Sequence, residues 1–285
     1  MLVHVLGPLR VDVDGTAVAL GGRRSQIVLA TLALTPNWVV PLDRLVDAVW
    51  GPAPPASART QIRICVSQLR RAFAGALAPT VIETHPNGYR LRVGAGELDA
   101  TVFNEEVARA RLLATQGAPE EAVTELRRAL SRWTGPAMAG LACPPVEAWA
   151  RRLEENRLRA VEERIRLELG LGRQQDLVGE LEQLVCAHPF REHLHGQLML
   201  ALHRSGRTAE ALAVYRRLRA ALVEELGIEP GPELRGLERG ILLGVAAVAL
   251  PGEPVTARRR ARAGDAAHPS RYPVQPSRVP STRAL

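Results

Sequence analysis

The residues whose types and spacing suggest chemistry lie in one stretch, RTQIRICVSQLRRAF, which runs from Arg59 to Phe73. A repeat of 3.6 residues puts four apolar residues on one stripe of a helix here, namely Ile62, Val66, Leu69 and Phe73. The rest of the helix surface is mostly polar and basic, with Thr60, Ile64, Ser67, Gln68 and Arg71 away from the stripe and Arg59, Arg63 and Arg70 along one flank. The segment therefore predicts a helix with one core-facing stripe and a second face that is free to bind a partner.

The elements before and after this segment have the order of a winged helix-turn-helix. Residues 2–20 alternate as short strands around an Asp14-Gly15 turn, which predicts a small antiparallel sheet. Two helices are expected next, one over Ser25–Leu34 and one that begins around Pro41-Leu42-Asp43. After the Arg59–Phe73 helix, TVIE and YRLRV predict two strands joined through residues 84–88, where Asn-Gly is a hairpin signal. In such an arrangement the third helix presents its far face to the major groove, and the hairpin is the wing.

Two kinds of DNA contact are expected from the third helix. Hydrogen bonds to base edges and phosphates are expected from Thr60, Ser67, Gln68 and Arg71, and contact with a thymine methyl group from Ile64. Bonds to the DNA backbone, which add affinity more than specificity, are expected from Arg59, Arg63 and Arg70. Spacing alone does not decide which of these residues reads a base.

Net charge divides the chain into three regions. Residues 1–93 carry +5, residues 94–250 carry −3 and residues 251–285 carry +5. A basic front, an acidic middle and a basic end indicate modules with different partners. All 37 basic residues are arginine, because the sequence contains no lysine, which excludes a P-loop lysine and a Schiff-base lysine.

Other residue patterns argue against an enzyme or a membrane protein. The three cysteines, Cys65, Cys143 and Cys186, are too far apart for a zinc site or a disulfide framework, which favours a reducing cytoplasm. The histidines at 188, 193, 195 and 203 lack the partner spacing of a metal centre. No signal peptide is recognisable, and the late apolar run at 241–250 is shorter than the ~20 residues that span a bilayer. We expect no catalytic residues, no metal, no cofactor and no membrane contact.

The middle of the chain repeats a helical pattern. Segments that begin at Gly117, Gly172 and Gly206 resemble one another, and the last two start 34 residues apart, the tetratricopeptide period. Residues 98–244 are therefore expected to form stacked helical hairpins, with an insertion in the first interval. The tail at 251–285, rich in Pro, Arg, Ser and Ala, is expected to be disordered.

These motifs together resemble the Streptomyces antibiotic regulatory protein family. The front matches through VLGPLRV, VVPLDRLVDAVWG, VSQLRRAF and NGYRL, and the middle through ELDATVF, EERIRLELGLGR and LVEELGIEPGPEL. The resemblance implies a mainly α fold: an OmpR-type winged helix-turn-helix with small β-sheets at residues 1–94, then a TPR-like all-α repeat domain, the bacterial transcriptional activator domain, at 98–244.

The resemblance also implies a function and further contact residues. It implies an activator of a secondary-metabolite (antibiotic) gene cluster in the cytoplasm. It would bind tandem direct repeats in promoter DNA near the −35 element, dimerise there and recruit RNA polymerase holoenzyme. Phosphate contacts are implied for Arg24 and Trp50, a minor-groove approach for the wing with Thr84 and Asn87, and a polymerase-facing role for Gly51–Ser57. No receiver domain precedes the sheet, so no phosphorelay control is expected. The alternative is a protein-interaction scaffold that uses the helical domain without specific DNA binding.

Overall fold

Short valine-rich strands open the chain. The computed structural model describes residues 1–75 and 81–244. Strands β1 (Leu2–His4), β2 (Arg10–Val13) and β3 (Thr16–Ala17) form an antiparallel sheet in that order. Alternation buries Val3, Val11 and Val13. Asp14 and Gly15 have φ of 49° and 80°, the left-handed values that a two-residue hairpin loop requires, so the predicted turn is confirmed.

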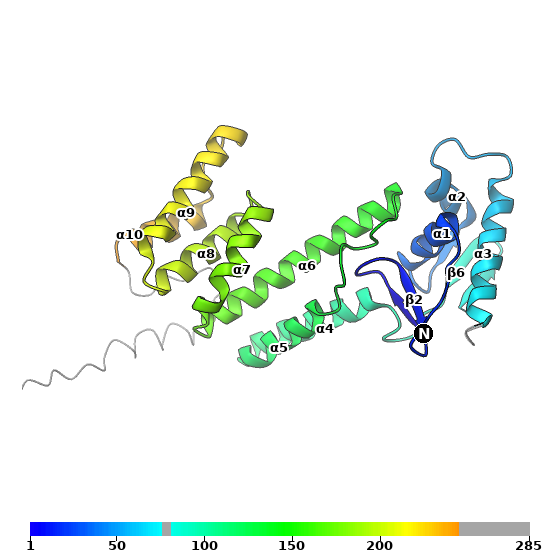
Figure 1. Ribbon diagram of the computed structural model, residues 1–285, viewed down its shortest axis with the longest axis horizontal. Coiled ribbons are helices and arrows are strands. Elements are labelled where there is room, and N and C mark those ends of the chain that lie inside the picture. The colour runs from blue at the N-terminus through cyan, green and yellow to red at the C-terminus, as the bar shows by residue number, and fades with distance from the viewer. Residues whose placement is uncertain (76–80, 245–285) are drawn as a thin grey trace, which may run out of the picture. The chain divides into compact units, whose positions relative to one another are not determined.

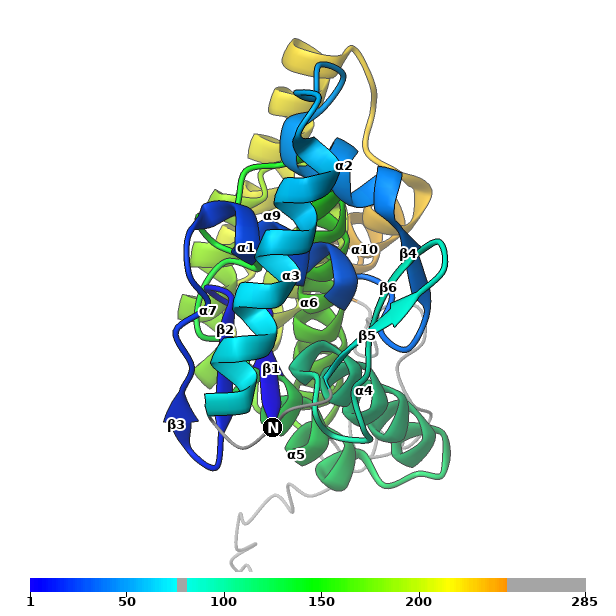
Figure 2. The ribbon, with the colours of Figure 1, turned by 90° about the vertical axis from the view of Figure 1, so that its right-hand side faces the viewer.

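Three helices follow, α1 (Arg23–Ala33), α2 (Leu42–Trp50) and α3 (Ala58–Gly75), and their bounds lie close to those predicted. α1 is buried along nearly its whole length and packs against both α2 and α3. Figure 2 shows α3 on the outside of this group, with the β5–β6 hairpin to one side of it. The third helix thus has the exposed position that a recognition helix needs.

A second sheet contains a strand that the sequence did not predict. β4 (Val39–Pro41), β5 (Ile82–His85) and β6 (Gly88–Leu91) are antiparallel in the order β4-β6-β5. The hairpin loop is Pro86-Asn87, because His85 pairs with Gly88, so the wing turn lies one residue earlier than its Asn87-Gly88 signal. Glycine is needed at 88 for another reason: a Cβ there would stand 2.0 Å from the carbonyl oxygen of Val40 on β4.

The remaining elements are helices. They are α4 (Asp99–Thr115), α5 (Pro119–Leu130), α6 (Pro144–Gly170), α7 (Gln174–Ala187), α8 (Glu192–Arg204), α9 (Thr208–Ala221), a π-helical turn (Leu222–Leu226) and α10 (Pro232–Leu242), as labelled in Figure 1 where space allows. Gly117, Gly172 and Gly206 lie between successive helices with φ of 79°, 82° and 79°. The repeated glycines therefore mark the turns of three helical hairpins, where glycine adopts the left-handed conformation without steric cost. The mainly α fold with a helical repeat domain is confirmed.

The N-terminal sheet is fastened to the first helices. The buried carboxylate of Asp99, at the start of α4, accepts hydrogen bonds from the amides of Val5 and Leu6 at 2.9–3.1 Å. The insertion between α5 and α6 adds two backbone bonds, from Thr134 N to Leu6 O and from Met138 N to Val5 O. One buried apolar cluster extends through the winged helix and into α4, α5 and α6. These elements consequently share a core.

By its contacts the chain forms two compact units, Met1–Leu177 and Val178–Leu285. The sequence-based limits, 1–94 and 98–244, stay a prediction about how the chain divides into domains. The predicted disorder of 251–285 concerns residues outside those that the structure describes. Within residues 1–75 and 81–244, no helix combines the length and the apolar character needed to cross a bilayer.

Candidate nucleic-acid interface

Helix α3 has the two faces that its sequence predicts. The predicted stripe of Ile62, Val66, Leu69 and Phe73 is buried, together with Ala58 and Cys65. Seven of the predicted contact residues are exposed on the rest of the helix: Arg59, Thr60, Arg63, Ile64, Ser67, Gln68 and Arg71. Ile64 is 51% exposed, although isoleucine is usually buried. This exposed position of Ile64 is compatible with the predicted contact with a thymine methyl group, which stays a prediction.

Two arginines on this face have no bonding partner within the described parts of the chain. Arg63 and Arg71 are exposed, and neither makes a hydrogen bond or an ion pair with residues 1–75 or 81–244. The hydroxyl groups of Thr60 and Ser67 likewise have no side-chain partner in those ranges. These four side chains can therefore bind a ligand without first giving up a bond inside the protein.

Other predicted contact residues are joined to neighbouring elements. Arg24 Nη1 donates to Gln61 Oε1 at 2.6 Å, and the Arg24 guanidinium lies 5.5 Å from the centroid of the Trp50 ring. Gln61 Nε2 in turn donates to Ser57 Oγ at 2.8 Å. These successive contacts connect α1, α2 and α3 with the end of the Gly51–Ser57 loop. Sequence reasoning missed Gln61. Its position four residues after Ser57 was the available signal for the hydrogen bond between the two side chains.

Two further bridges cross between helices. Ser25 Oγ, on α1, donates to Gln68 Oε1 at 3.2 Å, so Gln68 keeps its amide nitrogen for a ligand. Arg59 Nη2 lies 2.6 Å from Asp43 Oδ1 on α2, and both side chains are mostly exposed, at 64% and 70%. Such an exposed pair stabilises the fold little, and Asp43 holds a negative charge beside the expected DNA surface.

The position of Arg70 differs from the sequence-based expectation. We expected its guanidinium to bind the DNA backbone, but it faces the wing, where it donates to Ile82 O and Thr84 Oγ1. Thr84 belongs to β5 and not to the loop, and its side-chain oxygen accepts this bond. Helical spacing put Arg70 on a flank of α3; it did not show that β5 lies beside that flank.

The wing is held on its β6 side by β4 and the start of α2. Leu42 N donates to Asn87 O at 3.0 Å, and the Asn87 side chain is exposed at the tip of the hairpin. On the hairpin surface, Arg90 forms an ion pair with Glu83. The hydrogen bond from Arg90 lowers the pKa of Glu83. The pair leaves Glu83 ionised at neutral pH.

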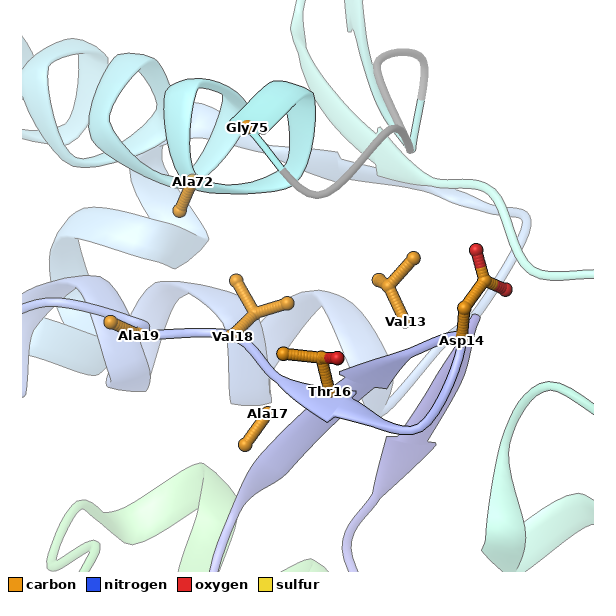
Figure 3. A pocket seen from close by; sticks show the side chains of 8 residues that line it. All are labelled: Val13, Asp14, Thr16, Ala17, Val18, Ala19, Ala72 and Gly75. Carbon is orange, nitrogen blue, oxygen red and sulfur yellow. The ribbon is translucent and has the colours of Figure 1, made fainter.

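Two hollows lie beside α3. One, of about 760 Å³, opens between α1 and the outer face of α3 and is lined by Gly22, Arg23, Arg24, Ser25, Gln61, Ile64, Cys65 and Gln68. The other, of about 500 Å³, lies between the β2–β3 hairpin and the C-terminal end of α3, where Figure 3 shows small and apolar side chains with Asp14 at one edge. The first is lined by Arg23 and Arg24, whose guanidinium groups can bind a phosphate group, whereas the second has no basic side chain among its lining residues.

In the described part of the second unit, His193, His195 and His203 lie on α8, and His188 follows α7. No group of three potential ligands occurs among residues 1–75 and 81–244. His195 is buried, its Nε2 is 3.0 Å from Pro189 O, and burial lowers its pKa. Since a neutral histidine with a backbone partner fits a packed helix, His195 is explained by the core of the hairpin.

A three-helix fold with a hairpin wing and an exposed basic helix face, followed by helical hairpins, defines a winged-helix transcriptional regulator. Comparison with protein families agrees. The model described as "Transcriptional regulatory protein, C terminal" matches residues 15–91, and "Bacterial transcriptional activator domain" matches residues 98–242.

Individual relatives show to which family of transcriptional regulators the chain belongs. The chain is 38% identical over 250 residues to the regulatory protein DnrI of Streptomyces peucetius, which covers 85% of this chain and 92% of that protein. It is 39% identical to AfsR of Streptomyces coelicolor over 84% of this chain and 24% of AfsR. The solved structure of Mycobacterium tuberculosis EmbR in complex with a low-affinity phosphopeptide matches with a TM-score of 0.83 at 35% identity, over 93% of this chain and 69% of that one. The chain belongs to the Streptomyces antibiotic regulatory protein family, whose DNA-binding domain is of the OmpR type.

Proposed function

We propose that this transcriptional regulator activates a secondary-metabolite gene cluster by binding tandem direct repeats near the −35 element and recruiting RNA polymerase holoenzyme. The observation that carries the proposal is the outer face of α3, where Arg63, Ile64, Ser67 and Arg71 are exposed. Polar, basic and apolar groups side by side on one helix match the mixture of phosphates, base edges and methyl groups in a major groove.

The contacts divide by element. Thr60, Ile64, Ser67 and Gln68 are assigned to base edges, and Arg59, Arg63, Arg71, Arg24 and Trp50 to phosphates at the groove edge. Asn87, exposed at the tip of the hairpin, carries the wing toward the minor groove, and Thr84 supports the wing through its bond to Arg70. Repeats about one helical turn apart, ~10.5 bp, put two copies on the same side of the duplex, where they form a dimer on DNA. The exposed loop Gly51–Ser57 is assigned to the polymerase, and the site of action is the cytoplasm.

The first experiment is a pull-down of sheared genomic DNA at physiological salt, with the bound fragments sequenced. We expect enrichment of a few promoters that carry tandem direct repeats. The matched variant is Ser67→Ala with Arg71→Ala, which changes two exposed side chains without touching the buried stripe. It should lose the enrichment and keep the thermal melting temperature. Uniform recovery of DNA by both proteins would support the scaffold alternative instead.

A further inference from the structure

Arg70 uses its guanidinium group inside the protein. Its Nε donates to Ile82 O at 2.9 Å, its Nη2 donates to Thr84 Oγ1 at 2.7 Å, and its Cζ lies 5.9 Å from the centroid of the Tyr89 ring. The first two partners belong to β5 and the third to β6. One side chain of α3 thus contacts both strands of the wing.

The sheet order explains why this contact matters. β6 is the central strand and is held by β4, while β5 is at the edge. Val81 O accepts a bond from Arg92 N, and because carbonyl groups alternate along a strand, Ile82 O points to the opposite edge. Arg70 therefore binds β5 on the side that no strand of the described sheet covers.

The neighbouring arginine provides the contrast. Arg71 follows Arg70 in the sequence, yet it is exposed and makes no ion pair or hydrogen bond with the residues that the structure describes. A guanidinium group holds its N–H donors in a rigid fork. Two of these donors in Arg70 bind Ile82 O and Thr84 Oγ1, which lie two residues apart on β5. Lysine ends in a single nitrogen, so it cannot place two separate donor atoms as the Nε and Nη2 of Arg70 do.

We propose that Arg70 is a positioning residue that fixes the wing relative to the recognition helix, so that both elements reach the duplex together. The inference rests on the proposed DNA binding, since it states how one part of that surface is held. Arg70 acts through β5 and not through a phosphate group.

The test compares Arg70→Ala, Arg70→Lys, Thr84→Val and the Arg70→Ala/Thr84→Val double variant, with Arg71→Ala as the matched control. Amide hydrogen exchange of residues 82–91 is measured by mass spectrometry in the full chain without DNA. The affinity for an enriched promoter fragment is measured by fluorescence anisotropy across a series of salt concentrations.

We expect Arg70→Ala to speed exchange in residues 82–91 and to weaken binding about tenfold, the effect of losing hydrogen bonds to a charged group. Arg70→Lys should recover only part of both losses, and the double variant should bind no more weakly than Arg70→Ala. Arg71→Ala should weaken binding while exchange in the hairpin stays unchanged.

The opposite pattern overturns the inference. Unchanged exchange in Arg70→Ala, with a reduced salt dependence like that of Arg71→Ala and additive losses in the double variant, would assign Arg70 to a phosphate. If Arg70→Ala does not fold, Thr84→Val decides, because it removes one acceptor and keeps the arginine; unchanged exchange would then refute the inference. If the wild-type protein does not prefer the promoter fragment to a shuffled one, the proposed function fails, and the exchange data alone decide whether Arg70 holds the wing.

Discussion

Replacing Gly88 by alanine should detach β4 from the wing. A Cβ at this position would lie 2.0 Å from Val40 O, 2.8 Å from Val40 C and 3.0 Å from Pro41 Cα. All three atoms are backbone, so no side-chain rotation relieves the clash, and the strands must separate. Overpacking typically costs about 1–3 kcal/mol, and each hydrogen bond lost between β4 and β6 adds about 1 kcal/mol. We expect the free energy of unfolding to fall by about 3 kcal/mol or slightly more.

Tryptophan fluorescence during urea unfolding measures this change in the right part of the molecule. All four tryptophans, at positions 38, 50, 133 and 149, belong to the unit Met1–Leu177. Gly135→Ala is the control, because its Cβ would make only an ordinary contact, 3.8 Å from Pro8 Cδ. Its effect should stay within about 0.5 kcal/mol. A loss below about 1 kcal/mol in Gly88→Ala would show that the close approach of β4 does not require glycine.

Three further outcomes are expected. Asp43→Asn should raise DNA affinity a few-fold, because it frees Arg59 and removes a negative charge from the surface, while stability changes by less than about 1 kcal/mol; anisotropy titrations with weaker binding would contradict this. Arg71→Ala should make the slope of log K against log[salt] shallower by about 0.9, and an unchanged slope would exclude a phosphate contact. On α4, a hydrogen bond from Arg132 lowers the pKa of Glu106 below its ordinary value of 4.5. The ionised carboxylate therefore stabilises the fold fully above about pH 4.5, and this stabilisation is lost as the pH falls through the lowered pKa. Glu106→Gln should flatten the loss of stability below about pH 4.5 in urea unfolding, and an unchanged profile would contradict the assignment.

The recognition helix was predictable because its residues interact mainly with the rest of the fold through one stripe. Ile62, Val66, Leu69 and Phe73 recur at helical spacing, and their burial is what the period implies. The hairpin turns of the repeat domain were predictable for a similar reason, since each requires a left-handed residue and each has glycine. Local conformational preference and periodicity depend on residues that are neighbours in the sequence, so they can be predicted from it.

The partners of the basic side chains were not predictable in this way. Arg70 and Arg71 are adjacent arginines, yet one binds β5 and the other is exposed. The three-residue strand β4 escaped prediction because it is too short to show alternation and exists by pairing with β6. Asn87-Gly88 correctly indicated a hairpin, but glycine is required at 88 for a different physical reason. A Cβ there would clash with Val40, which approaches from a distant part of the chain.

The sequence by itself determined the order of the elements other than β4, the two faces of α3 and the helical repeats. These follow from spacing and from the conformations that glycine, proline and apolar residues favour. The tertiary structure decided which exposed arginines are free for DNA and which hold the protein together. It also decided that the N-terminal sheet, through Asp99 and the residues after α5, shares a core with the first helices of the repeat domain. Contacts between segments far apart in the chain depend on the packing of whole elements, and residue spacing does not encode that packing.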